Sequence, residues 1–137
     1  MRTVPAIFVI AAVLLAAPAS LIGQTPALKG DRVSVAALLD PSSALYGRRL
    51  IVFGYYRDQG SDTAHHFGRL CVDRESMERG YHPNCVLVEA PKGLSRMSRW
   101  VDGRYVQVVG TASSENILSA FPGRLVDVTR IERYETR

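Results

Sequence analysis

The sequence predicts a small, mainly β domain with five strands and one short helix between the third and fourth strands, behind an N-terminal export segment. Five segments are rich in β-branched and aromatic residues, and their apolar and polar positions follow the alternation of strands. The chain has 137 residues, 47% of them hydrophobic, with 17 Lys and Arg against 13 Asp and Glu. This length and balance describe one globular domain and argue against coiled-coil and fibrous classes.

The N-terminus has the layout of a secretory signal peptide. Arg2 precedes an unbroken apolar run at residues 6–17, and an A-x-A cleavage site follows at residues 17–19. A retained membrane anchor is the alternative, but a spanning helix needs about 20 apolar residues and Pro18 interrupts this run earlier. We therefore expect residues 1–19 to be a cleaved signal helix and the mature protein to be periplasmic or secreted, with no membrane span after cleavage.

The segment between the signal and the domain has no apolar period. Residues 20–33 contain Gly, Pro and Thr, which predicts a flexible leader and places the domain at residues 34–137. Residues 34–39 are expected to form one or two helical turns. These turns end at Asp40, because Pro41 disfavours helix at the residue before it.

The first strand is expected at residues 48–56, where Gly54 indicates a bulge or a tight bend. The polar residues 57–66 predict a loop. The second and third strands, at residues 67–73 and 84–90, both alternate. One face of this pair is expected to carry Leu70, Val72, Val86 and Val88, and the other Phe67, Arg69, Cys71, Asp73, Cys85, Leu87 and Glu89.

A helix and two strands complete the expected order. Residues 91–100 place Leu94, Met97 and Trp100 at a helical spacing, with Pro91 at the start, where its missing N–H is harmless. The last two strands are expected at residues 104–112 and 124–131. A basic stretch accompanies the helix, which we interpret as a solvated face: Lys92, Arg96, Arg99 and Arg104.

Three stretches give the chain a resemblance to small secreted bacterial proteins built on the OB-fold. They are GRRLIVFGYY, DGRYVQVVGTAS and the closing GRLVDVTRIE, and the resemblance covers residues 37–134. It implies a five-stranded OB-like Greek-key barrel that binds ligands on the face of its second and third strands. Many such proteins have no assigned activity, so the resemblance implies a fold and a compartment and leaves the function open. A β-sandwich or another small barrel remains the alternative.

The two cysteines predict a disulfide. Cys71 and Cys85 lie 14 residues apart on the same face of consecutive strands, and an exported domain encounters an oxidising compartment. Closing a loop of about 15 residues stabilises a fold by roughly 3 kcal/mol in the chain-entropy model. A redox-active pair is the weaker interpretation, because no C-x-x-C motif is present.

A metal site is the competing use of this region. His82 and Cys85 have an H-x-x-C spacing, and His65 and His66 are adjacent, which suits zinc or copper. However, adjacent histidines usually point in opposite directions, and a cysteine in a disulfide cannot bind a metal. We expect three solvent-exposed loop histidines, with no metal and no cofactor.

From the sequence we expect that the protein is not an enzyme. It contains no G-x-S-x-G motif and no Gly-rich phosphate loop. Ser61 and Asp62 lie near His65, but in a predicted loop with nothing to orient them.

A binding surface is the remaining hypothesis. The face of the second and third strands would present Phe67, Arg69 and Leu87, and aromatic rings beside arginine stack on bases or sugars. The tyrosines expected nearby are Tyr55, Tyr56 and Tyr81. The alternative is that the tyrosines belong to the core.

The function expected from the sequence is therefore a secreted or periplasmic, non-catalytic binding or envelope-associated module. Its partner is expected to be an envelope protein or a small ligand. Nucleic acid is not expected. The net charge of +4 falls to +3 when Arg2 is removed with the signal, which is too small to argue by itself for nucleic acid or for an anionic membrane. The alternative is a metal- or cofactor-handling periplasmic protein that uses His65, His66, His82 and the cysteines.

Overall fold

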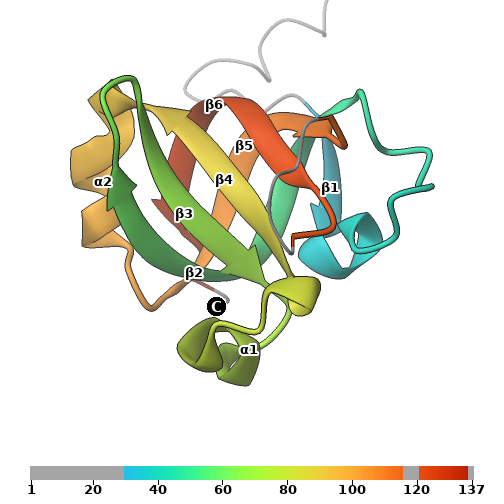
Figure 1. The fold of residues 1–137 in the computed structure, drawn as a ribbon, viewed down its shortest axis with the longest axis horizontal. Coiled ribbons are helices and arrows are strands. Elements are labelled where there is room, and N and C mark those ends of the chain that lie inside the picture. Colours follow the sequence, from blue (N-terminus) through green and yellow to red (C-terminus); the bar gives the residue numbers. More distant parts are fainter. Residues whose placement is uncertain (1–29, 116–120, 136–137) are drawn as a thin grey trace, which may run out of the picture.

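The computed structural model describes residues 30–115 and 121–135 (Figure 1). It contains six strands there, which are β1 Asp31–Ser34, β2 Arg49–Ser61, β3 His65–Cys71, β4 Cys85–Pro91, β5 Tyr105–Ser113 and β6 Arg124–Arg133. Five of them, β2 to β6, close into a barrel, while β1 pairs with the side of β2. The helices are α1 Arg74–Arg79 and α2 Ser95–Trp100, with short 3-10 turns η3 Val35–Leu38, η4 His82–Asn84 and η5 Lys92–Leu94. The predicted signal segment and most of the predicted leader lie outside the described residues.

The sheet order is β1-β2-β3-β4-β6-β5, and β5 also pairs with β2 to close the barrel. The β2–β3, β3–β4, β2–β5 and β5–β6 pairs are antiparallel, whereas β4–β6 and β1–β2 are parallel. α2 lies between β4 and β5 in the chain. The mainly β prediction, with a closed five-stranded barrel and a short helix, is confirmed.

Alternate residues of each strand point into the barrel and form the core. Leu50, Val52 and Tyr56 of β2 are fully buried, and so are their inward-facing counterparts on the other strands. Those counterparts include Leu70, Val86, Val88, Val106, Val108, Leu125 and Ile131. Gly54 allows β2 to approach β3 closely, because a Cβ atom there would lie 2.8 Å from the carbonyl oxygen of Cys71.

The prediction of a loop at residues 57–66 is wrong. β2 continues to Ser61 and β3 begins at His65, so only residues 62–64 connect the two strands. Polar groups of this extension, both backbone and side chain, have hydrogen-bond partners within the fold. The backbone N–H of Asp58 donates to Asp102 Oδ1 at 2.9 Å, and Asp58 Oδ1 accepts from His66 Nε2 at 2.7 Å.

Two elements were not expected from the sequence. β1 lies partly inside the predicted leader, and it pairs in parallel with residues 50–53 of β2. α1 follows β3 directly, and the Asp73 carboxylate caps its N-terminus while Gly80 ends it in the left-handed region at φ 69°.

α2 presents its apolar side chains to solvent. The buried residues at this corner are Ser98 and Val101, whereas Met97 and Trp100 are exposed. The Ser98 hydroxyl lies 2.5 Å from the Tyr56 hydroxyl inside the barrel, which anchors the helix through a polar contact. Among the described residues, none of the helices has the length and apolar character needed to cross a bilayer.

Candidate functional site

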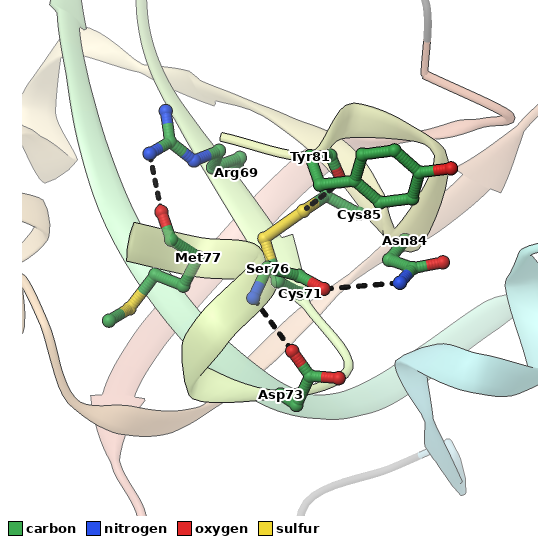
Figure 2. Close-up of a disulfide and its surroundings, with 8 residues drawn as sticks. All are labelled: Arg69, Cys71, Asp73, Ser76, Met77, Tyr81, Asn84 and Cys85. Atoms are coloured by element: carbon green, nitrogen blue, oxygen red, sulfur yellow. Dashed lines mark hydrogen bonds between the residues drawn. A yellow bond between two sulfur atoms is a disulfide. The ribbon is translucent and has the colours of Figure 1, made fainter. Parts of the chain in front are cut away.

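The predicted disulfide is confirmed. Cys71 and Cys85 are directly opposite each other in the β3–β4 register, and their sulfur atoms are bonded (Figure 2). Both side chains are fully buried on the outer face of the barrel rather than in its interior. A second, smaller apolar cluster forms around them, and it contains Met77, Phe121, Tyr55 and Leu87.

α1 covers the disulfide end of the face on which the sequence predicted ligand binding. Ser76 N–H donates to Asp73 Oδ1 at 2.7 Å, and Asn84 Nδ2 donates to the Ser76 hydroxyl at 3.1 Å (Figure 2). From β3, Arg69 Nη2 donates to the carbonyl oxygen of Met77 at 2.5 Å. The Arg69 bond ties the helix to β3, and the Asn84 bond ties it to η4, so the chain itself occupies part of the predicted binding face.

Four of the five residues that were predicted to bind a ligand lie on neighbouring strands, where Arg69 is directly opposite Leu87, and Tyr81 follows α1. Tyr55 and Leu87 pack against the disulfide cluster, and Tyr81 is 55% exposed. Phe67 and Arg69 are half-buried and share the outer face of β3. The predicted alternation holds for Leu70, Val86 and Val88, which are fully buried, whereas Val72 is only half-buried because β3 ends before it.

Arg69 has a structural contact, because its guanidinium binds the Met77 carbonyl oxygen of α1. Burial lowers the pKa of its guanidinium, and the nearby charge of Arg57 lowers that pKa further. Its Nε atom is buried without a hydrogen-bond partner among the described residues. Since Arg69 already holds α1, its availability to a ligand is restricted.

A different surface brings aromatic rings together on the outside of β2 and β5. Phe53 and Tyr134 make an edge-on contact with ring centroids 4.8 Å apart, and Tyr55 and Tyr105 make another at 5.0 Å. Tyr105 and Tyr134 join the two pairs at 6.0 Å. The four rings therefore form one continuous array.

Strand register explains this array. Phe53 and Tyr55 are two residues apart on β2, so they share its outer face. Tyr55 is directly opposite Tyr105 in the β2–β5 pair. Tyr134 follows the end of β6, and its N–H donates to the carbonyl oxygen of Tyr105 at 3.0 Å, which brings its ring beside the other three. Burial raises the pKa of Tyr105, with Tyr55 and Tyr134 adding smaller effects, so its phenol remains a neutral hydrogen-bonding group.

Arginines surround the rings. The guanidinium of Arg74 lies 5.3 Å from the centre of the Tyr55 ring, and that of Arg32 lies 5.9 Å from the centre of the Phe53 ring. Arg104 and Arg133 line a hollow together with Tyr105 and Tyr134. We call the whole set the aromatic–arginine surface, and its members are Phe53, Tyr55, Tyr105, Tyr134, Arg32, Arg74, Arg104 and Arg133.

Two adjoining hollows lie over this surface. The larger has a volume of about 730 Å³, and its lining includes Arg74, Arg104 and Arg133. The smaller, of about 260 Å³, is lined partly by Arg32 and Phe53. Both hollows share Tyr105 and Tyr134, so a ligand longer than one ring could contact both.

The acidic groups at the larger hollow are already engaged. Asp102 pairs with Arg57 at 3.4 Å, and Glu135 pairs with Arg133 at 3.2 Å. Arg74 and Arg104, in contrast, have no ion-pair partner within residues 30–115 and 121–135. Two cations are therefore left for an anionic ligand.

The β2–β3 hairpin contains a hydrogen-bonded serine, histidine and aspartate. His66 is 1% exposed, its Nε2 lies 2.7 Å from Asp58 Oδ1 and its Nδ1 lies 3.1 Å from the Ser61 hydroxyl. Because a carboxylate only accepts, Nε2 donates to Asp58, while Nδ1 and the Ser61 hydroxyl share the second hydrogen bond. This corrects two expectations, since His66 is not a solvent-exposed loop residue and Ser61 does have a group that orients it.

The surroundings of this array indicate a structural role. An acyl-transfer site needs free N–H groups that face the developing oxyanion. Here the N–H groups of Ala64 and His65 both donate to Asp62 Oδ1, at 2.8 and 2.7 Å. The array therefore holds the hairpin together, and the expectation that the protein is not an enzyme stays a prediction.

The groups considered for a metal site have other contacts. Both thiols are in the disulfide, and His82 stacks on Phe121 with ring centroids 4.3 Å apart. His65 lies 3.7 Å from a carboxylate oxygen of Glu89. Within the described ranges, no group of three or more His, Cys, Asp or Glu side chains is arranged to hold a metal ion.

Part of the aromatic–arginine surface was visible in the sequence. Phe53 and Tyr55 alternate within a predicted strand, and Tyr105 lies in another, but the pairing of these two strands follows only from barrel closure. Arg32 falls in the predicted leader. A comparison of the chain with protein-family models, curated proteins and solved structures finds no match, so the site rests on its geometry alone.

Proposed function

We propose that this protein is an exported, non-catalytic binding module of the OB type, and that its aromatic–arginine surface binds an anionic saccharide. The observation that carries the proposal is the continuous array of four rings flanked by two arginines without ion-pair partners. A sugar ring stacks on tyrosine, and a guanidinium pairs with a carboxylate, sulfate or phosphate through two parallel hydrogen bonds.

The strand arrangement supports the OB-type assignment. The order β2-β3-β4-β6-β5 places the last strand beside the third, and α2 connects the third and fourth strands of the barrel. A five-stranded Greek-key barrel of this kind binds oligosaccharides or oligonucleotides. The site proposed here lies on β2 and β5, because α1 and the disulfide cluster cover part of the face expected from the resemblance.

The disulfide supports export. A buried bond between Cys71 and Cys85 forms and persists in the periplasm or outside the cell, whereas cytosolic reductants would keep both thiols reduced. An extracellular location also favours saccharides over intracellular nucleic acid as the ligand.

A binding panel tests this proposal. Isothermal titration with a short oligogalacturonate, a neutral cello-oligosaccharide and AMP should give measurable binding for the acidic saccharide and none for the neutral one. The double variant Arg74→Gln, Arg104→Gln should weaken binding at least tenfold, since each charge-assisted hydrogen bond contributes about 1.5 to 3 kcal/mol.

The matched control is the double variant Arg79→Gln, Arg130→Gln, which removes the same charge at exposed positions outside the surface. It should bind like the wild type. Equal loss in both double variants would mean that only net charge matters, and tighter binding of AMP than of the saccharide would replace the proposed ligand class.

A further inference from the structure

We infer that the outward face of α2 is a docking surface for an anionic phospholipid bilayer. This surface is separate from the aromatic–arginine surface, and the inference does not depend on the proposed saccharide ligand. We call it the α2 patch. It consists of the exposed Met97 and Trp100 of α2, the half-buried Leu94 at the end of η5, and the surrounding cations Lys92, Arg96 and Arg99.

The apolar part of the patch is unusually exposed for a small domain. Trp100 is 78% exposed and Met97 is 41% exposed, although each would gain free energy from burial. Together with Leu94 and Arg96 they line a shallow hollow of about 370 Å³. Large apolar side chains gathered on one exposed face mark an interaction site more often than isolated ones do.

The helix is held against the barrel by its buried side. Ser98 is fully buried against the Tyr56 hydroxyl, and Val101, the residue after α2, is buried in the core. With α2 held in this orientation, Trp100 and Met97 lie toward solvent.

The charges around the patch favour an anionic partner. Residues 91–104 contain four cations and one acidic residue, Asp102. The Asp102 carboxylate already accepts from the Asp58 N–H at 2.9 Å and pairs with Arg57 at 3.4 Å. Lys92, Arg96 and Arg99 are exposed and make no ion pair within 4 Å among the described residues. Lys92 is nevertheless near enough to Asp62 to add to the lowered pKa that backbone hydrogen bonds give that carboxyl. Arg96 and Arg99 are therefore the two cations of the patch without an acidic neighbour of this kind in the described part of the chain.

This combination matches the chemistry of a membrane interface. Tryptophan prefers the headgroup level of a bilayer, and short apolar side chains insert just below it. Arginine and lysine lie along the apolar surface with their charges in the headgroups, where each contributes about 1 kcal/mol at an anionic surface. Two exposed apolar residues, the half-buried Leu94 and three cations predict weak, reversible binding that depends on anionic lipid and is screened by salt.

The test uses Trp100, the only tryptophan of the chain, as its own reporter. The protein is purified with whatever N-terminus the producing cell leaves on it. It is then titrated with vesicles of phosphatidylcholine alone or with one third phosphatidylglycerol. We expect the tryptophan emission to shift to shorter wavelength only with the anionic vesicles. Brominated lipid should quench it, and about 0.5 M salt should abolish the shift, because such salt reduces the screening length to a few ångströms.

Matched variants separate the patch from general charge. Arg96→Glu with Arg99→Glu should lower vesicle affinity roughly thirtyfold or more, since each lost basic residue contributes about fivefold. The control variant, Arg79→Glu with Arg130→Glu, changes the net charge by the same amount. It should bind the vesicles far more tightly than the Arg96→Glu, Arg99→Glu variant does. In vesicle sedimentation Trp100→Ser should lose binding, whereas Tyr81→Ser, at an exposed aromatic elsewhere, should retain it.

Four results would overturn the inference. The first is an absence of any emission shift with anionic vesicles, and the second is binding that is equal in both charge-reversed variants. The third is an emission already blue-shifted and shielded from acrylamide in buffer at every protein concentration, which would mean that another part of the chain covers the patch. The fourth is a lipid-independent shift that grows with protein concentration, which would assign the patch to a second copy.

Discussion

At the residue scale, Tyr56 shows how one side chain connects the barrel to α2. It is fully buried, its hydroxyl lies 2.5 Å from the Ser98 hydroxyl, and its ring lies directly against Gly68 of β3. A tyrosine can occupy the barrel interior only where its hydroxyl has a partner and its ring has space. Ser98 supplies the partner and Gly68 the space.

The first prediction concerns Gly68. A Cβ atom there would collide with the Tyr56 ring, so Gly68→Ala should lower the free energy of unfolding by about 1 to 3 kcal/mol through overpacking. Urea denaturation measures this loss. Gly93→Ala is the control, because nothing lies within 4 Å of a Cβ atom at that position. If the two variants unfold at the same urea concentration, the described packing of Tyr56 is incorrect.

The second prediction concerns alkaline pH. Burial raises the pKa of Tyr56 well above its usual 10.0, and the hydrogen bond with Ser98 opposes this only in part. The unfolded chain therefore loses the Tyr56 proton first, so the stability that this group provides is complete below pH 10 and is lost as the pH rises above it. Tyr56→Phe should be less stable at neutral pH by about 1 to 3 kcal/mol, because Ser98 loses its partner.

Denaturation curves between pH 8 and 11 check this prediction. The loss of stability above pH 10 should be steeper in the wild type than in Tyr56→Phe. Parallel curves for the two proteins would show that Tyr56 titrates normally in the folded state.

Single residues were only partly predictable from the sequence. Alternation placed Cys71 and Cys85 on one face, because that relation depends on local strand geometry. The burial of His66 could not be foreseen, since it depends on partners contributed by Asp58 and Ser61 across the hairpin.

At the element scale, the strands were easier to predict than the pieces around them. Long strands can be recognised from the alternation of apolar and polar residues. β1 has only four residues and gains its stability from parallel pairing with β2. α1 has one buried apolar residue, Met77, so it lacks a helical period. The sequence nevertheless contains the signals for both ends of α1, because Asp73 caps its N-terminus and Gly80 terminates it.

The third prediction concerns the β3–β4 pair and α1. Replacing both Cys71 and Cys85 with serine should lower the free energy of unfolding by about 2 to 5 kcal/mol, because the unfolded chain is no longer constrained and the cluster below α1 loses its centre. Thermal denaturation of this variant, and of the wild type with and without reductant, measures the loss. Unchanged stability, or two thiols that react freely in the oxidised native protein, would contradict it.

At the scale of the whole molecule, closure of the barrel creates the candidate site. Tyr55 and Tyr105 are far apart in the chain and meet because β5 returns to pair with β2. A sequence without the strand order could identify the rings but not their neighbours. The binding face was predicted around Phe67 and Arg69 because the resemblance to the OB-fold implies a site on the second and third strands. The general architecture was predictable from alternation, whereas the binding surface depends on contacts between strands distant in sequence.

The measurement that tests the central claim most directly is an NMR titration of the isotope-labelled protein with the oligogalacturonate, following every backbone amide. We predict that the shifted signals cluster at Phe53, Tyr55, Tyr105 and Tyr134 and at the arginines beside them, while Phe67 and Leu87 stay unchanged. Shifts that cluster at Phe67, Arg69 and Leu87 would contradict the account, because the ligand would then occupy the face of β3 and β4. The absence of any shift at saturating saccharide would contradict it as well.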